Sequence, residues 1–330
     1  MDTNENILLI RLKSIGDILF TLPAVHAVRE NFPSAKITFL VSKENASLLR
    51  GFRDVNEVIA IDRAALRSGN PFRVVPEFFS LLRRLRAGKF SLVVDFQGYG
   101  ETAWLARLTG ARERWGSVYS TGRKWAYTRG LKRKEDLHPA EWNLFLLREC
   151  GLKIGAIKNQ FVLPDDALAA AKKIFSEHKL DLAKPTLFIQ PFTSSPQKNW
   201  PFENYLALAN HWRACGVQVI IAGGPTDKPL LDRAQSLGFV IPSSRPRLTD
   251  AGLMKLSTLI VGGDTGFMHL AVALEKRVVM LIQRAGPGAA IPFRHPDWIV
   301  EPPAGFAVEH IKLEEVLQAS VAAFDECRTV

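Results

Sequence analysis

The sequence contains little cysteine and no long apolar run. Its 330 residues include three cysteines, which lie far apart at Cys150, Cys215 and Cys327. An odd number of scattered cysteines argues against a disulfide framework or a cysteine metal site, and favours a reducing compartment. No run approaches the ~18 consecutive apolar residues of a membrane span. The first five residues also lack the basic stretch of a secretory signal, so we expect a cytoplasmic protein.

Three motifs of nucleotide and metal chemistry are also missing. No Gly-x-Gly-x-x-Gly follows the first predicted strand, which argues against a dinucleotide-dependent dehydrogenase. The phosphate-binding loop Gly-x-x-x-x-Gly-Lys-Ser/Thr is absent, which excludes a P-loop enzyme. No Asp-x-Asp metal motif occurs, since Asp62 and Asp95 stand alone and Asp165 and Asp166 are adjacent. We therefore predict no metal ion.

Positive charge is in excess. The chain has 43 Lys and Arg residues against 33 Asp and Glu residues, a net charge of +10. This balance suggests an anionic partner, namely nucleic acid, anionic lipid or an acidic substrate. Residues 107–134 contain nine basic residues and one acidic residue, with two tryptophans and two tyrosines among them. A second basic cluster, within residues 83–89, is explained by a solvated helix face.

Short apolar segments alternate with helical patterns along the chain, in two successive series. The predicted strands are residues 7–12, 36–41, 57–61, 91–95, 186–190, 217–222, 258–261 and 277–282. Strands that alternate with helices predict βαβ units and a parallel sheet with helices on both faces. Residues 111–136 interrupt this alternation, and we interpret them as an irregular basic segment.

The length leaves room for two such α/β domains, each with its own core. We predict a Rossmann-like N-terminal domain over residues 1–160 and a Rossmann-like C-terminal domain over residues 161–312. Residues 313–330 are predicted to form an amphipathic helix that packs back toward the N-terminal domain.

Two stretches combine the end of a strand, a turn and the start of a helix. One runs from residue 7 through Ser14-Ile-Gly-Asp17, and the other from residue 259 through Gly262-Gly-Asp-Thr-Gly266. This geometry points free backbone N–H groups toward an anion. An ordinary turn, with Asp or Thr as helix N-cap, explains each stretch on its own equally well.

Four segments, in this order, resemble the pattern of glycosyltransferase family 9, the ADP-heptose:lipopolysaccharide heptosyltransferases. They are Arg11-Leu-Lys-Ser-Ile-Gly-Asp17, Asp95-Phe-Gln-Gly98, Gln197-Lys-Asn-Trp-Pro201 and Gly263-Asp-Thr-Gly-Phe-Met-His269. The resemblance implies a GT-B fold, in which two Rossmann-like domains face a central cleft. It further implies an inverting, metal-independent enzyme without a cofactor, which moves a heptose from ADP-heptose to the inner core of lipopolysaccharide.

On the donor side, the resemblance implies that Lys198 contacts a phosphate, whereas the sequence alone favours an ordinary surface lysine. The hydroxyl and amide groups of Thr193, Ser194, Thr265 and Gly266 are candidates to hold the diphosphate of the nucleotide sugar.

Three further donor-side residues have two interpretations each. Asp264 either accepts hydrogen bonds from sugar hydroxyls or caps a helix. Asp227 either accepts from the nucleotide ribose or caps the following helix, and the family often has Glu at this position. His269 is an ordinary core or surface histidine in the sequence alone, and belongs to the donor site by resemblance.

On the acceptor side, the candidate general base is Asp17. Attack by a sugar hydroxyl needs a base, and the resemblance assigns this role to the aspartate of the Ser-x-Gly-Asp segment. The alternative is that Asp17 caps the helix that follows. Lys13, Ser14 and Gly16 are predicted to shape the acceptor pocket, with Gln97 nearby.

The basic segment gains a purpose if the acceptor is an anionic, lipid-linked saccharide. Arg112 and Arg123 are then candidates to bind its carboxylates or phosphates. The neighbouring Trp and Tyr residues suit a peripheral contact with the inner face of the cytoplasmic membrane.

Two rival hypotheses stay open. A transferase with another nucleotide-sugar donor is one, because the sugar pocket is not evident in the sequence. A non-enzymatic basic protein that binds nucleic acid or a saccharide is the other. Against nucleic acid, no recognised nucleic-acid module is present, and the basic residues concentrate in one loop.

Overall fold

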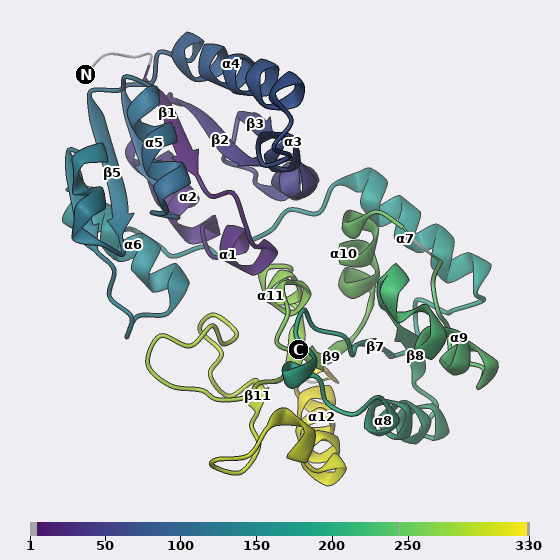
Figure 1. Cartoon of the computed structure of the whole chain (residues 1–330). Helices are drawn as coiled ribbons and strands as arrows, with labels where there is room; N and C mark the ends of the chain where they lie inside the picture. Colours follow the sequence, from purple (N-terminus) through teal and green to yellow (C-terminus); the bar gives the residue numbers. More distant parts are fainter. Residues whose placement is uncertain (1–4, 244, 329–330) are drawn as a thin grey trace. The chain divides into compact units, whose positions relative to one another are not determined.

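The computed structural model describes residues 5–243 and 245–328, and the chain divides into two compact units, Met1–Val162 and Leu163–Val330. The sequence prediction placed this boundary between residues 160 and 161. Each unit is built on one parallel sheet flanked by helices (Figure 1). The predicted α/β class with two Rossmann-like domains is confirmed.

The N-terminal unit contains a six-stranded sheet in the order β3-β2-β1-β4-β5-β6, which is the Rossmann order. Its strands are β1 (Asn6–Ile10), β2 (Lys36–Ser42), β3 (Glu57–Ile61), β4 (Leu92–Asp95), β5 (Glu113–Val118) and β6 (Arg129–Lys132). Its helices are α1 (Ile15–Leu19), α2 (Leu22–Asn31), α3 (Arg63–Leu66), α4 (Pro71–Ala87), α5 (Gly100–Leu108) and α6 (Pro139–Glu149), with the 3₁₀ helices η1 (Lys43–Gly51) and η2 (Thr121–Ala126).

The strand order of this sheet reverses at β1. The chain runs from β1 outward to β2 and β3, and then crosses to β4 on the other side of β1. Because such connections are right-handed, the helix that joins β1 to β2 and the helix that joins β4 to β5 lie on opposite faces of the sheet. Helix α2 packs against α6, and α4 packs against α5. In sheets of this type, ligands bind at the carboxyl ends of the strands that flank the reversal, here β1 and β4.

The central strands are apolar because both faces of each sheet are covered. Residues 7–10 of β1 have no exposed surface, and neither do residues 259–261 in the C-terminal unit. Full burial of one such aliphatic side chain contributes about 1.5–3 kcal/mol. The two turns that follow these strands therefore start from fixed positions.

The C-terminal unit contains a five-stranded parallel sheet in the order β11-β10-β9-β7-β8. Its strands are β7 (Thr186–Gln190), β8 (Gln218–Ile221), β9 (Leu259–Gly263), β10 (Arg277–Leu281) and β11 (Ile299–Val300). Its helices are α7 (Asp165–Glu177), α8 (Phe202–Ala214), α9 (Lys228–Ser236), α10 (Arg247–Leu256), α11 (Gly266–Ala273) and α12 (Leu313–Arg328), with the 3₁₀ helices η3 (Pro196–Lys198), η4 (Pro225–Asp227) and η5 (Val308–His310).

Helix α12 packs on β9, β10 and α8. The Trp212 ring lies 4.4 Å from the Phe324 ring, and Trp212 Nε1 donates to Ser320 Oγ at 3.1 Å. These contacts hold α12 on the sheet of the C-terminal unit, and its predicted packing toward the N-terminal domain stays a prediction. In the part of the chain that the structure describes, no helix has both the length and the apolar character of a membrane span.

The prediction of an irregular segment over residues 111–136 is wrong. Strands β5 and β6 lie there and extend the sheet in parallel, with Trp115 opposite Arg129. Charged residues hide the apolar pattern: Glu113 and Arg114 begin β5, and Arg129 and Lys132 lie at the two ends of β6. The exposure of β6 is that of an edge strand, with no fully buried residue, and such a strand gives a weak sequence signal.

Candidate functional site

The first group of predicted residues lies at the carboxyl ends of β1 and β4. These strands are neighbours, with Ile10 opposite Asp95, so the turns after them meet. Gln97 Oε1 accepts from Leu12 N at 2.8 Å, and Arg11 Nη1 donates to Phe96 O at 2.9 Å. We call residues 11–17 and 95–98 the Asp17 site.

Asp17 lies in the first turn of α1 and has a buried cationic partner. Its Oδ1 is 2.7 Å from Arg11 Nη2, and its Oδ2 accepts from Ser14 N and Ser14 Oγ, both at 3.1 Å. Burial acts to raise the pKa of Asp17, but the Arg11 guanidinium and the Ser14 hydrogen bonds outweigh it and hold the pKa below its ordinary value. The N-cap position of α1 is occupied by Ser14, and Asp17 caps the same helix from its first turn, because its carboxylate accepts from the N-cap backbone. Asp17 is an ionised carboxylate with 37% of its side chain exposed.

The other predicted acceptor residues differ in accessibility. Lys13 and Ser14 are exposed at the start of α1, whereas Gly16 is buried within that helix. Gln97 is fully buried, and its Nε2 has no hydrogen-bond partner among the described residues. Because Gln97 accepts from Leu12 N, it holds the loop after β1 in place. Gln97 therefore shapes the Asp17 site through that loop.

The turn after β4 depends on Asp95, which the sequence analysis quoted but did not assign. Asp95 is fully buried, and its Oδ2 accepts from Tyr127 Oη at 2.6 Å. Its Oδ1 accepts from Gln97 N at 2.9 Å and Gly98 N at 3.0 Å. Burial raises the pKa of Asp95 in spite of these hydrogen bonds. Gly98 has a φ of +69°, and a Cβ there would collide with Ser117 O, so the turn requires glycine.

Two arginines of the basic segment reach this region. Arg123 Nη1 donates to Gly98 O at 3.2 Å. Arg133 lies over the rings of Tyr119 and Trp142, and Asp17 and Arg11 are among the charges that act on it. Burial and the Arg11 charge lower the pKa of Arg133. The sequence analysis counted Arg133 only as one of nine basic residues, because no local motif marks it.

The second group of predicted residues follows β7 and β9, which are also neighbouring strands. Lys198 Nζ donates to Asp264 Oδ2 at 2.6 Å. His269 Nε2 lies 3.8 Å from Asp264 Oδ1. Burial acts to raise the pKa of Asp264, but His269 and Lys198 outweigh it and lower the pKa. We call residues 193–198 and 262–269 the Asp264 site.

Two glycines allow the parts of the Asp264 site to approach one another. A Cβ at Gly262 would lie 2.5 Å from Gln190 O, and a Cβ at Gly263 would lie 2.6 Å from Thr193 Cγ2. The helix that follows, α11, has Thr265 rather than Asp264 as its N-cap, so the N-cap alternative for Asp264 is wrong. The turn brings Asp264 and the loop after β7 together because no side chain separates them.

The hydroxyl groups predicted to hold phosphate lie in different surroundings. Thr193 Oγ1 donates to Ser195 O at 2.7 Å, and Ser194 is exposed. Thr265 Oγ1 is buried and has no hydrogen-bond partner in the described part of the chain. Gly266 is the first residue of α11, so its backbone N–H is one that the helix leaves without an internal acceptor.

Asp227 lies in the turn after β8, and no contact joins it to Lys198 or Asp264 in the described structure. Its Oδ2 accepts from Gly224 N at 2.8 Å, and its Oδ1 is 3.4 Å from Thr226 Oγ1. Asp227 is also the N-cap residue of α9. Its position matches the capping interpretation, although in the described structure its carboxylate makes no capping hydrogen bond to α9, and a ribose contact stays a prediction. Within residues 5–243 and 245–328, no three His, Cys, Asp or Glu side chains form a metal-binding group.

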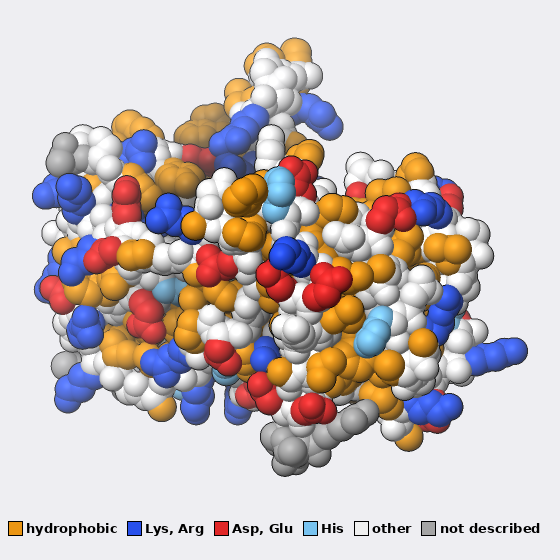
Figure 2. Space-filling model, turned by 90° about the horizontal axis from the view of Figure 1, so that it is seen from below, with side chains coloured by type: hydrophobic (Ala, Val, Ile, Leu, Met, Phe, Trp, Pro, Cys, Tyr) orange, Lys and Arg blue, Asp and Glu red, His pale blue; other side chains and the backbone are white. Residues whose placement is uncertain are grey.

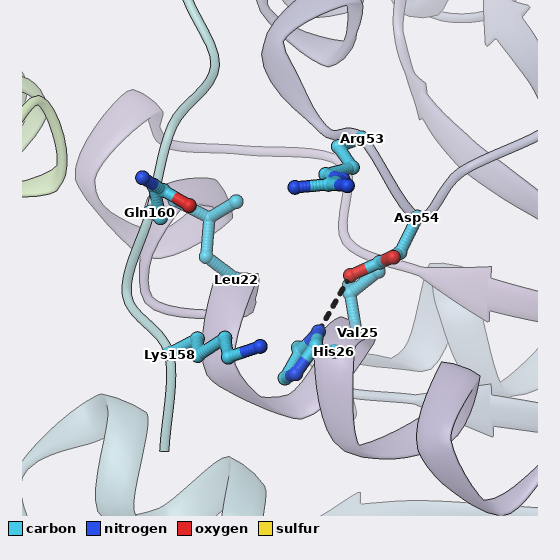
Figure 3. A pocket seen from close by; sticks show the side chains of 7 residues that line it. All are labelled: Leu22, Val25, His26, Arg53, Asp54, Lys158 and Gln160. Atoms are coloured by element: carbon cyan, nitrogen blue, oxygen red, sulfur yellow. Dashed lines mark hydrogen bonds and ion pairs between the residues drawn. The ribbon is translucent and has the colours of Figure 1, made fainter. Parts of the chain in front are cut away.

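The N-terminal unit also has a shallow pocket of about 240 Å³ that contains none of the predicted residues. Figure 3 shows it between α2, the turn at Asp54 and the segment that carries Lys158 and Gln160. His26 Nδ1 lies 2.9 Å from Asp54 Oδ2 across one wall. Arg53 and Lys158 at its rim are exposed, and we assign no substrate to it.

Comparison with known proteins gives one family. The model of glycosyltransferase family 9 (heptosyltransferase) matches residues 78–301. The chain is 21% identical, over 276 residues, to lipopolysaccharide heptosyltransferase 3 of Escherichia coli strain K12, and the match covers 81% of this chain and 79% of that protein.

Solved structures of this family share the fold. A glycosyltransferase family 9 protein from Veillonella parvula superposes with a TM-score of 0.86 at 18% identity and covers 99% of both chains. E. coli heptosyltransferase WaaC with ADP-2-deoxy-2-fluoro heptose superposes with a TM-score of 0.77 at 20% identity, covering 96% of this chain and 99% of that one.

Proposed function

The chain belongs to glycosyltransferase family 9 (heptosyltransferase) and is a glycosyltransferase enzyme, and from this premise we propose that it transfers heptose from ADP-heptose to the inner core of lipopolysaccharide. The name of the E. coli relative supports the acceptor class. The WaaC structure, which contains a fluorinated ADP-heptose, supports the donor. The Asp264 site is the observation in this chain that carries the proposal.

In this proposal the Asp264 site holds the donor diphosphate. Lys198 is 45% exposed on its side chain, so its ammonium can turn from Asp264 to a phosphate oxygen. Charge develops on the leaving phosphate as the bond from the anomeric carbon to the β-phosphate oxygen breaks. Lys198 and the free N–H groups at the start of α11 stabilise this charge. They supply the positive field, so transfer is metal-independent. Asp264 and His269 bind the sugar and keep the turn in place.

Asp17 acts on the acceptor in this proposal. It takes the proton of the attacking hydroxyl while the oxygen bonds to the anomeric carbon from the face opposite the leaving phosphate, which inverts the configuration. A lowered pKa makes Asp17 a weak base. A weak base suits a displacement in which proton transfer comes late, after the sugar has gained positive charge.

The acceptor is an anionic, lipid-linked saccharide in this proposal. Lys13 lies exposed at the Asp17 site, and Arg123 and Arg133 border it. Guanidinium groups bind carboxylates and phosphates with two parallel hydrogen bonds. The enzyme then works as a peripheral protein at the inner face of the cytoplasmic membrane, where such a saccharide is made accessible.

The first test is a thermal-shift screen of the protein against ADP, UDP, GDP and CMP, repeated with Lys198→Ala. A nucleotide at 100 times its Kd stabilises the folded state by about 2.7 kcal/mol. We expect ADP alone to raise the melting temperature, and Lys198→Ala to remove the effect. A response to UDP or GDP instead would keep a transferase and reject heptose, and no response to any nucleotide would reject the donor site.

A further inference from the structure

Helix α4 carries a water-facing apolar stripe. Phe72 is 88% exposed, Val75 49% and Phe79 61%. Residues three, four and seven apart lie on one side of a helix, so these three side chains form one surface. Large apolar side chains gathered on the surface mark an interaction site more often than isolated ones do.

The core does not account for this stripe. The two fully buried residues of α4, Leu81 and Leu85, lie in its second half and on the opposite side. The first half is held by polar contacts, since Asn70 Oδ1 accepts from Phe72 N at 3.0 Å and Glu77 Oε1 accepts from Asp62 N at 3.2 Å. Figure 1 shows α4 on the outside of the N-terminal unit. The three exposed side chains therefore serve no packing purpose within this unit.

The same stripe ends in positive charge. Arg83 and Arg86 come four and seven residues after Phe79, on the same side of the helix, and both are exposed. Across its 17 residues, α4 contains four arginines and one acidic residue, Glu77. The solvated helix face predicted for residues 83–89 is thus the basic end of a longer apolar and basic surface. We call Phe72, Val75, Phe79, Arg83 and Arg86 the α4 stripe.

We propose that the α4 stripe docks the enzyme on an anionic phospholipid surface. A bilayer interface presents an apolar layer directly beside a layer of phosphates. The apolar residues of the stripe match the first layer, and its two arginines match the second. Amphipathic helices with Phe or Leu on one part and Lys or Arg on another bind there with their apolar side chains about 5–10 Å deep. Arg side chains near an anionic leaflet add favourable electrostatic energy.

Charge distinguishes α4 from the face of the molecule shown in Figure 2. On the face shown in Figure 2, Lys and Arg side chains alternate with Asp and Glu side chains, whereas α4 has a fourfold excess of arginine. A second exposed aromatic group covers itself in part, because the Trp104 and Trp125 rings lie 4.5 Å apart. Trp104 and Trp125 are 58% and 47% exposed, against 88% and 61% for Phe72 and Phe79. The need for a membrane rests on the proposed function, because the proposed acceptor is lipid-linked. The choice of docking surface rests on the exposed side chains of α4 alone.

The experiment is co-sedimentation of the full chain with vesicles of phosphatidylcholine, with and without phosphatidylglycerol. We expect binding only with phosphatidylglycerol, and weaker binding at high salt. Phe72→Ser with Phe79→Ser is expected to lower the partition coefficient about tenfold or more, and Arg83→Gln with Arg86→Gln to remove the preference for anionic lipid. The matched control, Leu182→Ser with Leu237→Ser, changes two exposed apolar side chains of the C-terminal unit and is expected to bind as wild type. Phe72→Ser alone, at a side chain that is 88% exposed, gives a variant that folds normally.

Three results would overturn the proposal. Wild-type protein could fail to bind anionic vesicles, the phenylalanine variant could bind them unchanged, or that variant could lose self-association in sedimentation velocity while vesicle binding persists. The last result would assign the stripe to a second copy of the chain. Heptose transfer and membrane docking are tested separately by two acceptors, one delipidated and water-soluble and one held in vesicles. With the soluble acceptor, the phenylalanine variant is expected to keep the wild-type kcat/KM. With the acceptor in vesicles, its kcat/KM is expected to fall. A wild-type protein that binds vesicles through α4 but transfers no heptose would reject the proposed function and leave the docking surface standing.

Discussion

The two carboxylates of the proposed reaction are paired with very different cations. Asp17 pairs with Arg11, whose side chain is 9% exposed, at 2.7 Å. Asp264 pairs with Lys198, whose side chain is 45% exposed, at 2.6 Å. Arg11 also donates to Phe96 O and Lys13 O, so its guanidinium is fixed by the backbone of both turns. Lys198 has a flexible stem and pairs with one carboxylate among the described residues, and it can exchange this partner for a phosphate.

The exposure of the cation distinguishes the fixed Arg11–Asp17 pair from the Lys198–Asp264 pair, which can open. An ion pair whose cation is buried keeps its carboxylate in one position and one charge state. An ion pair with a half-exposed lysine holds the site in order until a more highly charged anion arrives. In the proposed reaction, the fixed pair suits the acceptor side, where a base must be positioned, and the opening pair suits the donor side, where a cation must move to the ligand.

The largest expected effect is that of Asp17→Asn. Asparagine keeps the shape of the side chain and accepts from Ser14, but it cannot take a proton. We expect kcat for heptose transfer to fall about 10²–10⁴-fold, with the ADP-induced thermal shift unchanged. Steady-state ADP release measures the first quantity. Asp62→Asn, at an aspartate that caps α3 in the same unit, is the control and is expected to keep wild-type kcat. An Asp17→Asn enzyme with nearly full activity would show that Asp17 is not the base.

Lys198→Ala is expected to act on the donor. Loss of one group that stabilises transition-state charge lowers kcat about 10²–10³-fold, and here the Kd of ADP should rise as well. The free enzyme should melt near the wild-type temperature, because half-exposed ion pairs contribute about 0–1 kcal/mol. Lys228→Ala is the matched control, since Lys228 pairs with Asp232 at 2.6 Å on the surface of the same unit. Equal effects of the two variants would remove Lys198 from the donor site.

Arg11→Ala tests the comparison through stability. It leaves the Asp17 carboxylate without its cation and two backbone carbonyls without a donor. We expect the free energy of unfolding to fall by about 2–3 kcal/mol, below the range for a fully buried pair because Asp17 is partly exposed. Urea denaturation of Arg11→Ala and Lys198→Ala side by side measures the difference. If Lys198→Ala destabilises the protein as much as Arg11→Ala, the distinction between a fixed and an opening pair is wrong.

The sequence predicted the parts of each site that are contiguous. A buried strand followed by a turn and a helix start is visible as an apolar run, a glycine and a polar residue, so Asp17 and Asp264 could be identified. The same local pattern could not show that Lys198 meets Asp264, which lies 66 residues further along the chain. The family resemblance assigned Lys198 to a donor phosphate, and its contact with Asp264 was not predicted.

Contacts across the sheet were beyond the sequence. Asp95 meets Tyr127, which is 32 residues away, only because β4 lies beside β5. The pairing of β5 and β6 was missed because charged residues at their ends obscured the strand pattern. Asp227 shows a different limit of local patterns, since an acid after a strand suggests a ribose contact, and the same position suits a helix cap.

The smallest expected effect is on stability at acid pH, and it sharpens the comparison. The folded pKa values of Asp17 and Asp264 are both below the ordinary value of about 3.9. Folding therefore favours the ionised forms, and each aspartate contributes stability that is present above about pH 4 and is lost as the pH falls through its lowered folded pKa.

Salt separates the two contributions. Asp264 depends in part on the half-exposed ammonium of Lys198, which salt screens, whereas Asp17 depends on the buried guanidinium of Arg11. We expect Asp17→Asn and Asp264→Asn each to flatten the fall in unfolding free energy below pH 4. Added salt should shrink the difference between wild type and Asp264→Asn more than that between wild type and Asp17→Asn. Urea denaturation at low and high salt measures both differences. Equal salt dependence would mean that solvent reaches both ion pairs alike, and that the Asp17 pair opens as readily as the Asp264 pair.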